Sequence, residues 1–207
     1  MELKTWLVFL AVSILPVISP GPAILLAVSN ALRFGPRATM YSATGNMLGL
    51  IGVGFAVAFG LAAIMAASAA AFAVVKFVGA IYLIYLGVKL WRDKQAFVPQ
   101  TGPAPLAKTP LKLFAEAFFV SVTNPKAIII LAALIPPFID ANKAAFPQVA
   151  IMSATYAGMC FLNHLALASA GGWMRRMFAS ERRMRNLRRT LGGMFIGFGA
   201  ALATASR

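Results

Sequence analysis

The chain has 207 residues, of which 60% are hydrophobic and only 12% are charged; this excludes a soluble domain and predicts an all-α polytopic membrane protein. The net charge of +14 comes from basic residues in the predicted loops, so we expect membrane lipid as a partner and no nucleic acid. The single cysteine, Cys160, excludes an internal disulfide framework and a metal-thiolate site. No metal or other cofactor is expected.

Six apolar segments follow one another and predict six transmembrane helices, because about 20 helical residues suffice to cross a bilayer. The first is interpreted as a retained span, since its apolar run is too long for a signal peptide and SPGPA is a poor cleavage site. The proline-rich stretch at about 92–112 predicts a loop, and the basic run at 173–189 predicts a surface amphipathic helix in contact with lipid. The expected spans are about 5–31, 38–66, 72–91, 113–139, 147–172 and 190–206.

The first and fourth segments are each interrupted near their middle. The interrupting residues are Ser19, Pro20, Gly21 and Pro22 in the first segment, and Asn124, Pro125 and Lys126 in the fourth. A proline in a helix interior costs roughly 3 kcal/mol. A lysine at the bilayer midplane costs at least about 2.5 kcal/mol. Two long hydrophobic segments interrupted at corresponding places predict the binding site of a transporter.

The distribution of lysine and arginine predicts the orientation of the chain. Fourteen of these residues lie in the loops after the first, third and fifth spans, against four at the two termini and in the other two loops. Basic loops stay in the cytoplasm, so both termini are expected outside it, in a cell inner membrane. The first and fourth spans then run in opposite directions. This predicts one transmembrane domain over 1–207, built as two inverted three-helix repeats at about 1–92 and 113–207.

Glycines in the predicted second and sixth spans indicate close helix packing. Gly45 and Gly49 are four residues apart in the second span, a spacing that lets helix backbones approach each other. These glycine faces offer more close-packing surface than six helices need, so we expect a homodimer. In the fourth span, Glu116 is expected to pair with Lys112, four residues earlier on the same helix face.

The interrupted spans suit a zwitterionic amino acid, which needs a partner for its carboxylate and another for its ammonium group. Broken helices expose N–H groups at one end and carbonyls at the other. Gly21 would allow a close approach of backbone and ligand. Lys126 would bind the carboxylate or gate by losing a proton; the alternative is that it caps free carbonyls or snorkels. Asn124 would bind substrate or satisfy the broken backbone.

His164 in the predicted fifth span is a candidate for proton coupling, because histidine titrates near neutral pH. The alternative is a hydrogen bond between helices. Lys126 is the other candidate carrier of the coupling proton. Carboxylates are scarce within the spans and no sodium-site pattern is evident, so protons are the expected driving ions.

Four stretches together resemble the LysE/RhtB family of amino-acid exporters. They are the PGP of the first span, the GxxxG of the second, YLIYLGVKLWR at the end of the third and NPKAIIILAALIPPF in the fourth. The resemblance covers nearly the whole chain, and Glu116 with Ala117 departs from the glycine expected before NPK. It implies six spans, no nucleotide-binding domain, and export of amino acids or related metabolites driven by the proton motive force.

Three other functions stay open at this point. A membrane-embedded enzyme is disfavoured, because the spans contain no HExxH, no paired carboxylates and no Ser/His/Asp set. Related translocators move other small solutes or cations, and the lack of His-rich or Cys-rich loops disfavours metal efflux. A membrane subunit that transports nothing is the third alternative.

Overall fold

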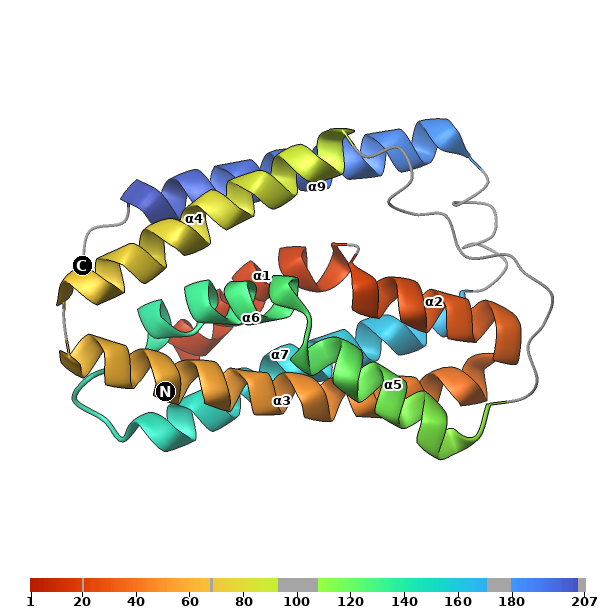
Figure 1. Cartoon of the computed structure of the whole chain (residues 1–207), viewed down its shortest axis with the longest axis horizontal. Coiled ribbons are helices and arrows are strands. Elements are labelled where there is room, and N and C mark those ends of the chain that lie inside the picture. Colours follow the sequence, from red (N-terminus) through yellow and green to blue (C-terminus); the bar gives the residue numbers. More distant parts are fainter. Residues whose placement is uncertain (20, 68, 93–107, 171–179, 205–207) are drawn as a thin grey trace.

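The computed structural model describes residues 1–19, 21–67, 69–92, 108–170 and 180–204, and within them it contains helices and no strand (Figure 1). An all-helical chain fits a bilayer, where each backbone polar group must find its partner within its own segment. The helices are α1 (Leu3–Ile18), α2 (Pro22–Phe34), α3 (Pro36–Ala67), α4 (Ala69–Arg92), α5 (Pro110–Val122), α6 (Pro125–Leu134), the 3-10 turn η1 (Pro136–Phe138), α7 (Ala145–Ser169) and α9 (Glu181–Thr204).

The two predicted interruptions are present as bends between helices. α1 and α2 meet at 65°, and α5 and the α6 segment meet at 56°. α3 and α7 are each long and apolar enough to cross a membrane alone, so the described residues hold two candidate spans, or up to four if each bent pair counts as one. The inverted arrangement of six spans therefore stays a prediction.

The expected separate helix in the basic run was wrong for the part of that run that the structure describes. α9 begins at Glu181, within the basic run, and continues without interruption to Thr204. Residues 181–190 contain no glycine or proline and are rich in arginine, which favours helix, so nothing locally ends the helix before the apolar part. The described part of the basic run is thus the first part of α9 and not a separate surface helix.

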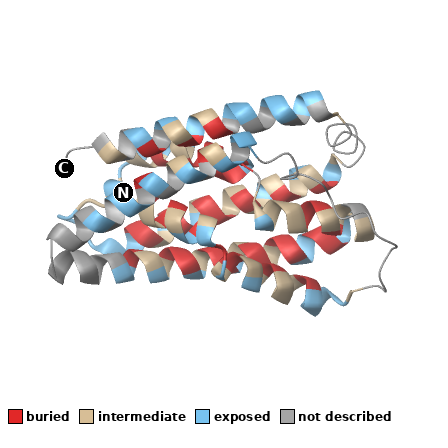
Figure 2. Ribbon diagram, turned by 45° about the horizontal axis from the view of Figure 1, so that its top comes forward, coloured by how far each residue is buried: buried red, intermediate tan, exposed pale blue. Residues whose placement is uncertain are grey.

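The core forms where α3 packs against α5 and α7, with the half-helices α1, α2 and α6 against these (Figure 1). Phe9, Leu131, Ile135 and Met152 are fully buried at its centre. Buried residues gather on the inward sides of the helices, while many exposed residues are large and apolar (Figure 2). An extensive exposed apolar surface is what a lipid-facing protein presents.

Glycines allow the closest contacts between helices. A Cβ atom at Gly45 would overlap the backbone carbonyl of Phe114 in α5, and one at Gly49 would lie 2.8 Å from Cβ of Ser121. In the pair formed by α4 and α9, a Cβ atom at Gly87 would lie 2.5 Å from the carbonyl oxygen of Gly192. These glycines serve packing within the chain, so they do not by themselves provide a face for a homodimer.

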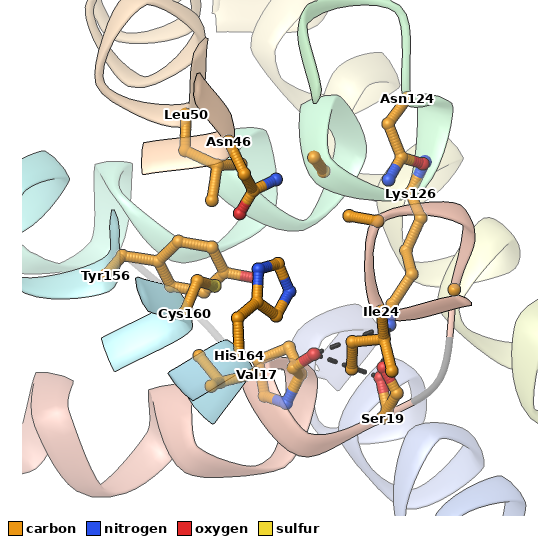
Figure 3. A pocket seen from close by; sticks show the side chains of 14 residues that line it. Val17, Ser19, Ile24, Asn46, Leu50, Asn124, Lys126, Tyr156, Cys160 and His164 are labelled. Carbon is orange, nitrogen blue, oxygen red and sulfur yellow. Dashed lines mark hydrogen bonds between the residues drawn. The ribbon is translucent and has the colours of Figure 1, made fainter. Parts of the chain in front are cut away.

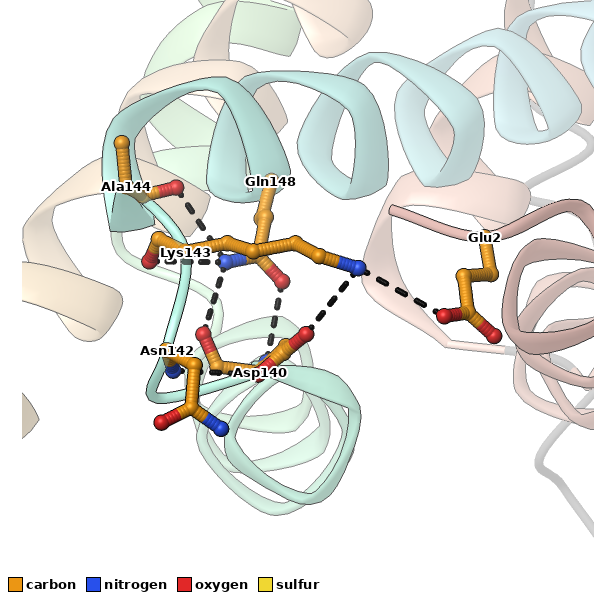
Figure 4. A network of polar contacts seen from close by, with 6 residues as sticks. All are labelled: Glu2, Asp140, Asn142, Lys143, Ala144 and Gln148. Carbon is orange, nitrogen blue, oxygen red and sulfur yellow. Dashed lines mark hydrogen bonds and ion pairs between the residues drawn. The ribbon is translucent and has the colours of Figure 1, made fainter.

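The start of α1 and the loop before α7 are tied together at one end of the molecule (Figure 4). Lys143 lies 3.1 Å from the carboxylate of Asp140 and 3.5 Å from that of Glu2. The buried Gln148 accepts a hydrogen bond from the backbone N–H of Asp140 and donates to three loop carbonyls. A hydrogen bond from the Asn142 backbone, together with Lys143, lowers the pKa of Asp140.

Glu116 pairs with Lys108 at 2.6 Å and not with Lys112 as expected. Thr109 is the N-cap of α5 and its hydroxyl accepts from the backbone N–H of Lys112. The cap therefore turns the chain at Thr109, and the residue before it folds back along the helix toward Glu116.

Candidate functional site

The two broken spans meet at Lys126. This lysine lies in the first turn of α6, and its Nζ reaches across to the C-terminal end of α1. There it donates hydrogen bonds to the carbonyl oxygen of Ser19 at 2.5 Å, to the Ser19 Oγ at 2.5 Å and to the carbonyl oxygen of Pro16 at 3.4 Å. The last carbonyls of a helix lack intrahelical partners and carry the negative end of its dipole, so they suit an ammonium group.

Local sequence explains how each break is made. Pro22 and Pro125 each occupy the first position of the second half-helix, with Gly21 and Asn124 as the N-caps. A proline at this position removes no intrahelical hydrogen bond. The roughly 3 kcal/mol expected for an interior proline therefore does not apply. Pro20 lies outside the described residues.

Asn124 and Gly21 shape the surroundings of Lys126. The Oδ1 of Asn124 accepts a hydrogen bond from the backbone N–H of Lys126 at 3.0 Å, which is the structural role that the sequence left open. A Cβ atom at Gly21 would lie 3.0 Å from Cδ of Lys126. Gly21 thus leaves room for the lysine side chain, where the sequence suggested room for a ligand.

A cavity of about 40 Å³ lies between the breaks (Figure 3). It has room for about three water molecules, at roughly 10–15 Å³ each, so a whole amino acid would require it to widen. Residues from five helices and from both breaks line it. They are Pro16, Val17, Ser19, Gly21, Ala23, Ile24, Asn46, Leu50, Asn124, Lys126, Ala127, Tyr156, Cys160 and His164.

Two buried polar side chains face this cavity with an atom that no described residue satisfies. Asn46 is 1% exposed; its Nδ2 donates to the Ser121 Oγ, while its Oδ1 has no hydrogen-bond partner among the described residues. His164 is 2% exposed, and its Nδ1 likewise has none. An unsatisfied buried polar group costs about 1–3 kcal/mol.

A residue from the last helix also reaches the site. Phe195 of α9 is 1% exposed, and the Nζ of Lys126 lies 5.8 Å from the centre of its ring. At this distance the ring attracts the ammonium group. α9 therefore contributes to the surroundings of Lys126, although it packs mainly along α4.

The structure brings together part of the predicted site. Gly21, Asn124, Lys126 and His164 line the cavity; Pro22 and Pro125 start the half-helices beside it, and Gly45 and Gly49 lie against α5. Ser19 was expected only as part of the first interruption, and the sequence analysis did not select Asn46, Tyr156 or Cys160 for the site. A signal was present on α7, because positions 156, 160 and 164 are spaced four residues apart and share a helix face.

Comparisons with known proteins agree on a transporter family. The family described as LysE type translocator matches residues 14–206. A homoserine/homoserine lactone efflux protein of Salmonella typhimurium is 32% identical over 99% of this chain and 98% of its own length. An uncharacterized membrane protein of Vibrio cholerae is 33% identical over 99% of both chains. No solved structure matches the chain.

Proposed function

The chain belongs to the LysE type translocator family, whose members are transporters and not enzymes, and from that premise we propose that it exports a small amino-acid-like metabolite using the proton motive force. We place it in the inner membrane, with substrate and coupling protons sharing the cavity between the two breaks. The observation that carries the proposal is the reach of Lys126 from the start of α6 to the end of α1.

The names of the Salmonella relatives guide the substrate class. They are described as efflux proteins for homoserine and homoserine lactone, two compounds that share an α-amino group and a carbonyl carbon. The carboxylate or carbonyl of such a substrate would lie between Lys126 and the first turn of α2. Ala23 and Ile24 of that turn line the cavity. N–H groups in the first turn of a helix lack intrahelical partners and favour negative charge.

The same geometry suggests how transport would proceed. Lys126 belongs to the second predicted repeat and its partners Ser19 and Pro16 belong to the first, so this contact joins the two halves. A substrate carboxylate competes with the Ser19 and Pro16 oxygens for the ammonium group. Binding would then loosen the link between the halves, and their rocking about the site would alternate its access. His164, in the cavity wall, is the proposed second carrier of protons.

Transport into proteoliposomes tests this function. Purified protein is expected to exchange labelled L-homoserine for unlabelled L-homoserine, and an imposed proton gradient is expected to drive accumulation that a protonophore abolishes. Metabolite profiling of medium from cells with and without the protein extends the test to other compounds. The proposed substrate class is contradicted if the proteoliposomes exchange no amino acid or amino-acid derivative and the profiled medium gains none. Exchange that ignores the proton gradient contradicts the proposed coupling.

A further inference from the structure

The amide of Asn46 is held in one orientation by a neighbouring hydrogen-bond chain. The Ser121 hydroxyl donates its proton to the carbonyl oxygen of Ala117 at 2.8 Å. A hydroxyl has one proton, so toward Asn46 the Ser121 oxygen acts as an acceptor. The Asn46 Nδ2 must therefore point to Ser121, as it does, and Oδ1 is the atom left for the cavity.

This orientation leaves the cavity with two ends of opposite character (Figure 3). One end carries the ammonium donor of Lys126. The other end carries Asn46 and His164, whose Oδ1 and Nδ1 atoms have no hydrogen-bond partner among the described residues. Oδ1 can only accept, and a neutral imidazole can accept at Nδ1. Both side chains are at least 98% buried, so only a molecule inside the cavity can supply the missing donors.

The chemistry of this second end favours an ammonium group over a hydroxyl. An ammonium has three donors and can satisfy both acceptors at once, whereas a hydroxyl has a single proton and can satisfy one. None of the described residues that line the cavity is acidic, so the cavity wall offers no carboxylate to a second ammonium group on the substrate.

We propose that Asn46 Oδ1, together with His164, forms the subsite for the α-ammonium group of the exported compound, and that the cavity excludes dibasic amino acids. This proposal rests on the proposed function. It makes Asn46 a specificity-determining residue and Ser121 the residue that positions it.

Binding to purified protein tests the subsite with two probes that differ by one group. L-homoserine carries the ammonium, and 4-hydroxybutanoate is the same chain without it. Dissociation constants from thermal-shift titrations are compared as a ratio, which cancels any general loss of binding. The wild-type protein is expected to prefer L-homoserine by at least about tenfold, and Asn46→Leu is expected to bring the ratio close to one. The matched control Asn30→Leu, a buried asparagine of α2 outside the cavity wall, is expected to keep it.

The outcomes separate the subsite from the transport function. A ratio that is unchanged in Asn46→Leu, or near one in the wild type, overturns the subsite while leaving export standing. Wild-type protein that neither binds nor exports any amino acid overturns both. If Asn46→Leu does not fold, Ser121→Ala takes its place: the amide can then turn, and the ratio is expected to fall by a few-fold. A wild-type ratio in folded Ser121→Ala overturns the proposal.

Discussion

Lys126 shows how a charged side chain is accommodated in an apolar segment. Its ammonium group is held by two backbone carbonyls and a hydroxyl at the end of α1, with the Phe195 ring nearby. Hydrogen bonds to charged groups contribute about 1.5–3 kcal/mol each, enough to offset the roughly 2.5 kcal/mol of the insertion scale. The sequence left open whether Lys126 caps free carbonyls or binds a carboxylate. The described contacts are those of a cap. On substrate binding, Lys126 would exchange an α1 oxygen for an oxygen of the substrate.

Substituting Lys126 separates these roles. Lys126→Met keeps the length of the side chain and removes the charge, so we expect export per folded molecule to be lost. The melting temperature should fall as well, because the α1 carbonyls lose a donor, at a cost of about 1–3 kcal/mol. Lys126→Arg keeps the charge but does not readily lose a proton. Partial export in this variant indicates carboxylate binding, and none indicates obligatory deprotonation. Export assays normalised to folded protein measure both, and normal specific export in Lys126→Met would end the functional case.

At the scale of helices, the sequence predicted that the first and fourth spans break but not how their ends are satisfied. A proline in an apolar run shows that a continuous helix is interrupted. It does not show that Pro22 and Pro125 begin new helices with Gly21 and Asn124 as caps, because that depends on where the chain resumes helical geometry. That the two breaks would meet was expected from their corresponding places in the two halves. The contacts they make there are tertiary, and no local pattern encodes them.

Removing the prolines should affect transport more than folding. In Pro22→Ala or Pro125→Ala, alanine permits helical geometry across the break, which would hide the N–H groups and carbonyls that the site uses. We expect each variant to export at a small fraction of the wild-type rate at similar abundance. Pro137→Ala, at an exposed position of the η1 turn outside the cavity wall, is the matched control and should export normally. Wild-type rates in both break variants would reduce the breaks to simple bends.

The packing of α3 on α5 gives a prediction for stability. Gly45→Ala places a methyl group against the backbone carbonyl of Phe114, which cannot move aside as a flexible side chain would. Overpacking of this kind typically costs about 1–3 kcal/mol. Gly52→Ala on the same helix meets no atom within 4 Å and should be neutral or slightly stabilising. Thermal melts of the two variants in detergent measure the difference, and equal melting temperatures would show that α3 and α5 separate easily.

Across the whole molecule, the ion pair of Lys143 with Glu2 holds the N-terminal end of α1 beside the loop before α7. The C-terminal ends of α3 and α9 lie at this same end of the molecule (Figure 1). The charge bias in the sequence predicted these segments to share a side, and it also predicted that this side faces away from the cytoplasm. Hydrophobic pattern and charge can supply this level of organisation because a bilayer acts on every span in the same way.

Labelling of introduced cysteines tests which side this is. Glu2→Cys is expected to react with a membrane-impermeant maleimide in intact cells, and Arg37→Cys, in the exposed first turn of α3, only after the membrane is opened. The native Cys160 is buried, so its background should be low. The reverse labelling pattern would show that the termini face the cytoplasm and that both predicted repeats have the opposite orientation in the membrane.

The pairing of α4 with α9 also has a consequence for how the protein is made. A ribosome delivers the chain from its N-terminus, so α4 enters the membrane long before the helix that covers it is synthesised. Until Gly192 arrives, only lipid or insertion machinery can cover α4 at Gly87. Final assembly is then a long-range closure by the last helix to emerge, which also carries Phe195 to Lys126. A nascent chain stopped before α9 therefore contains the helices on both sides of each break but lacks the Phe195 ring beside Lys126.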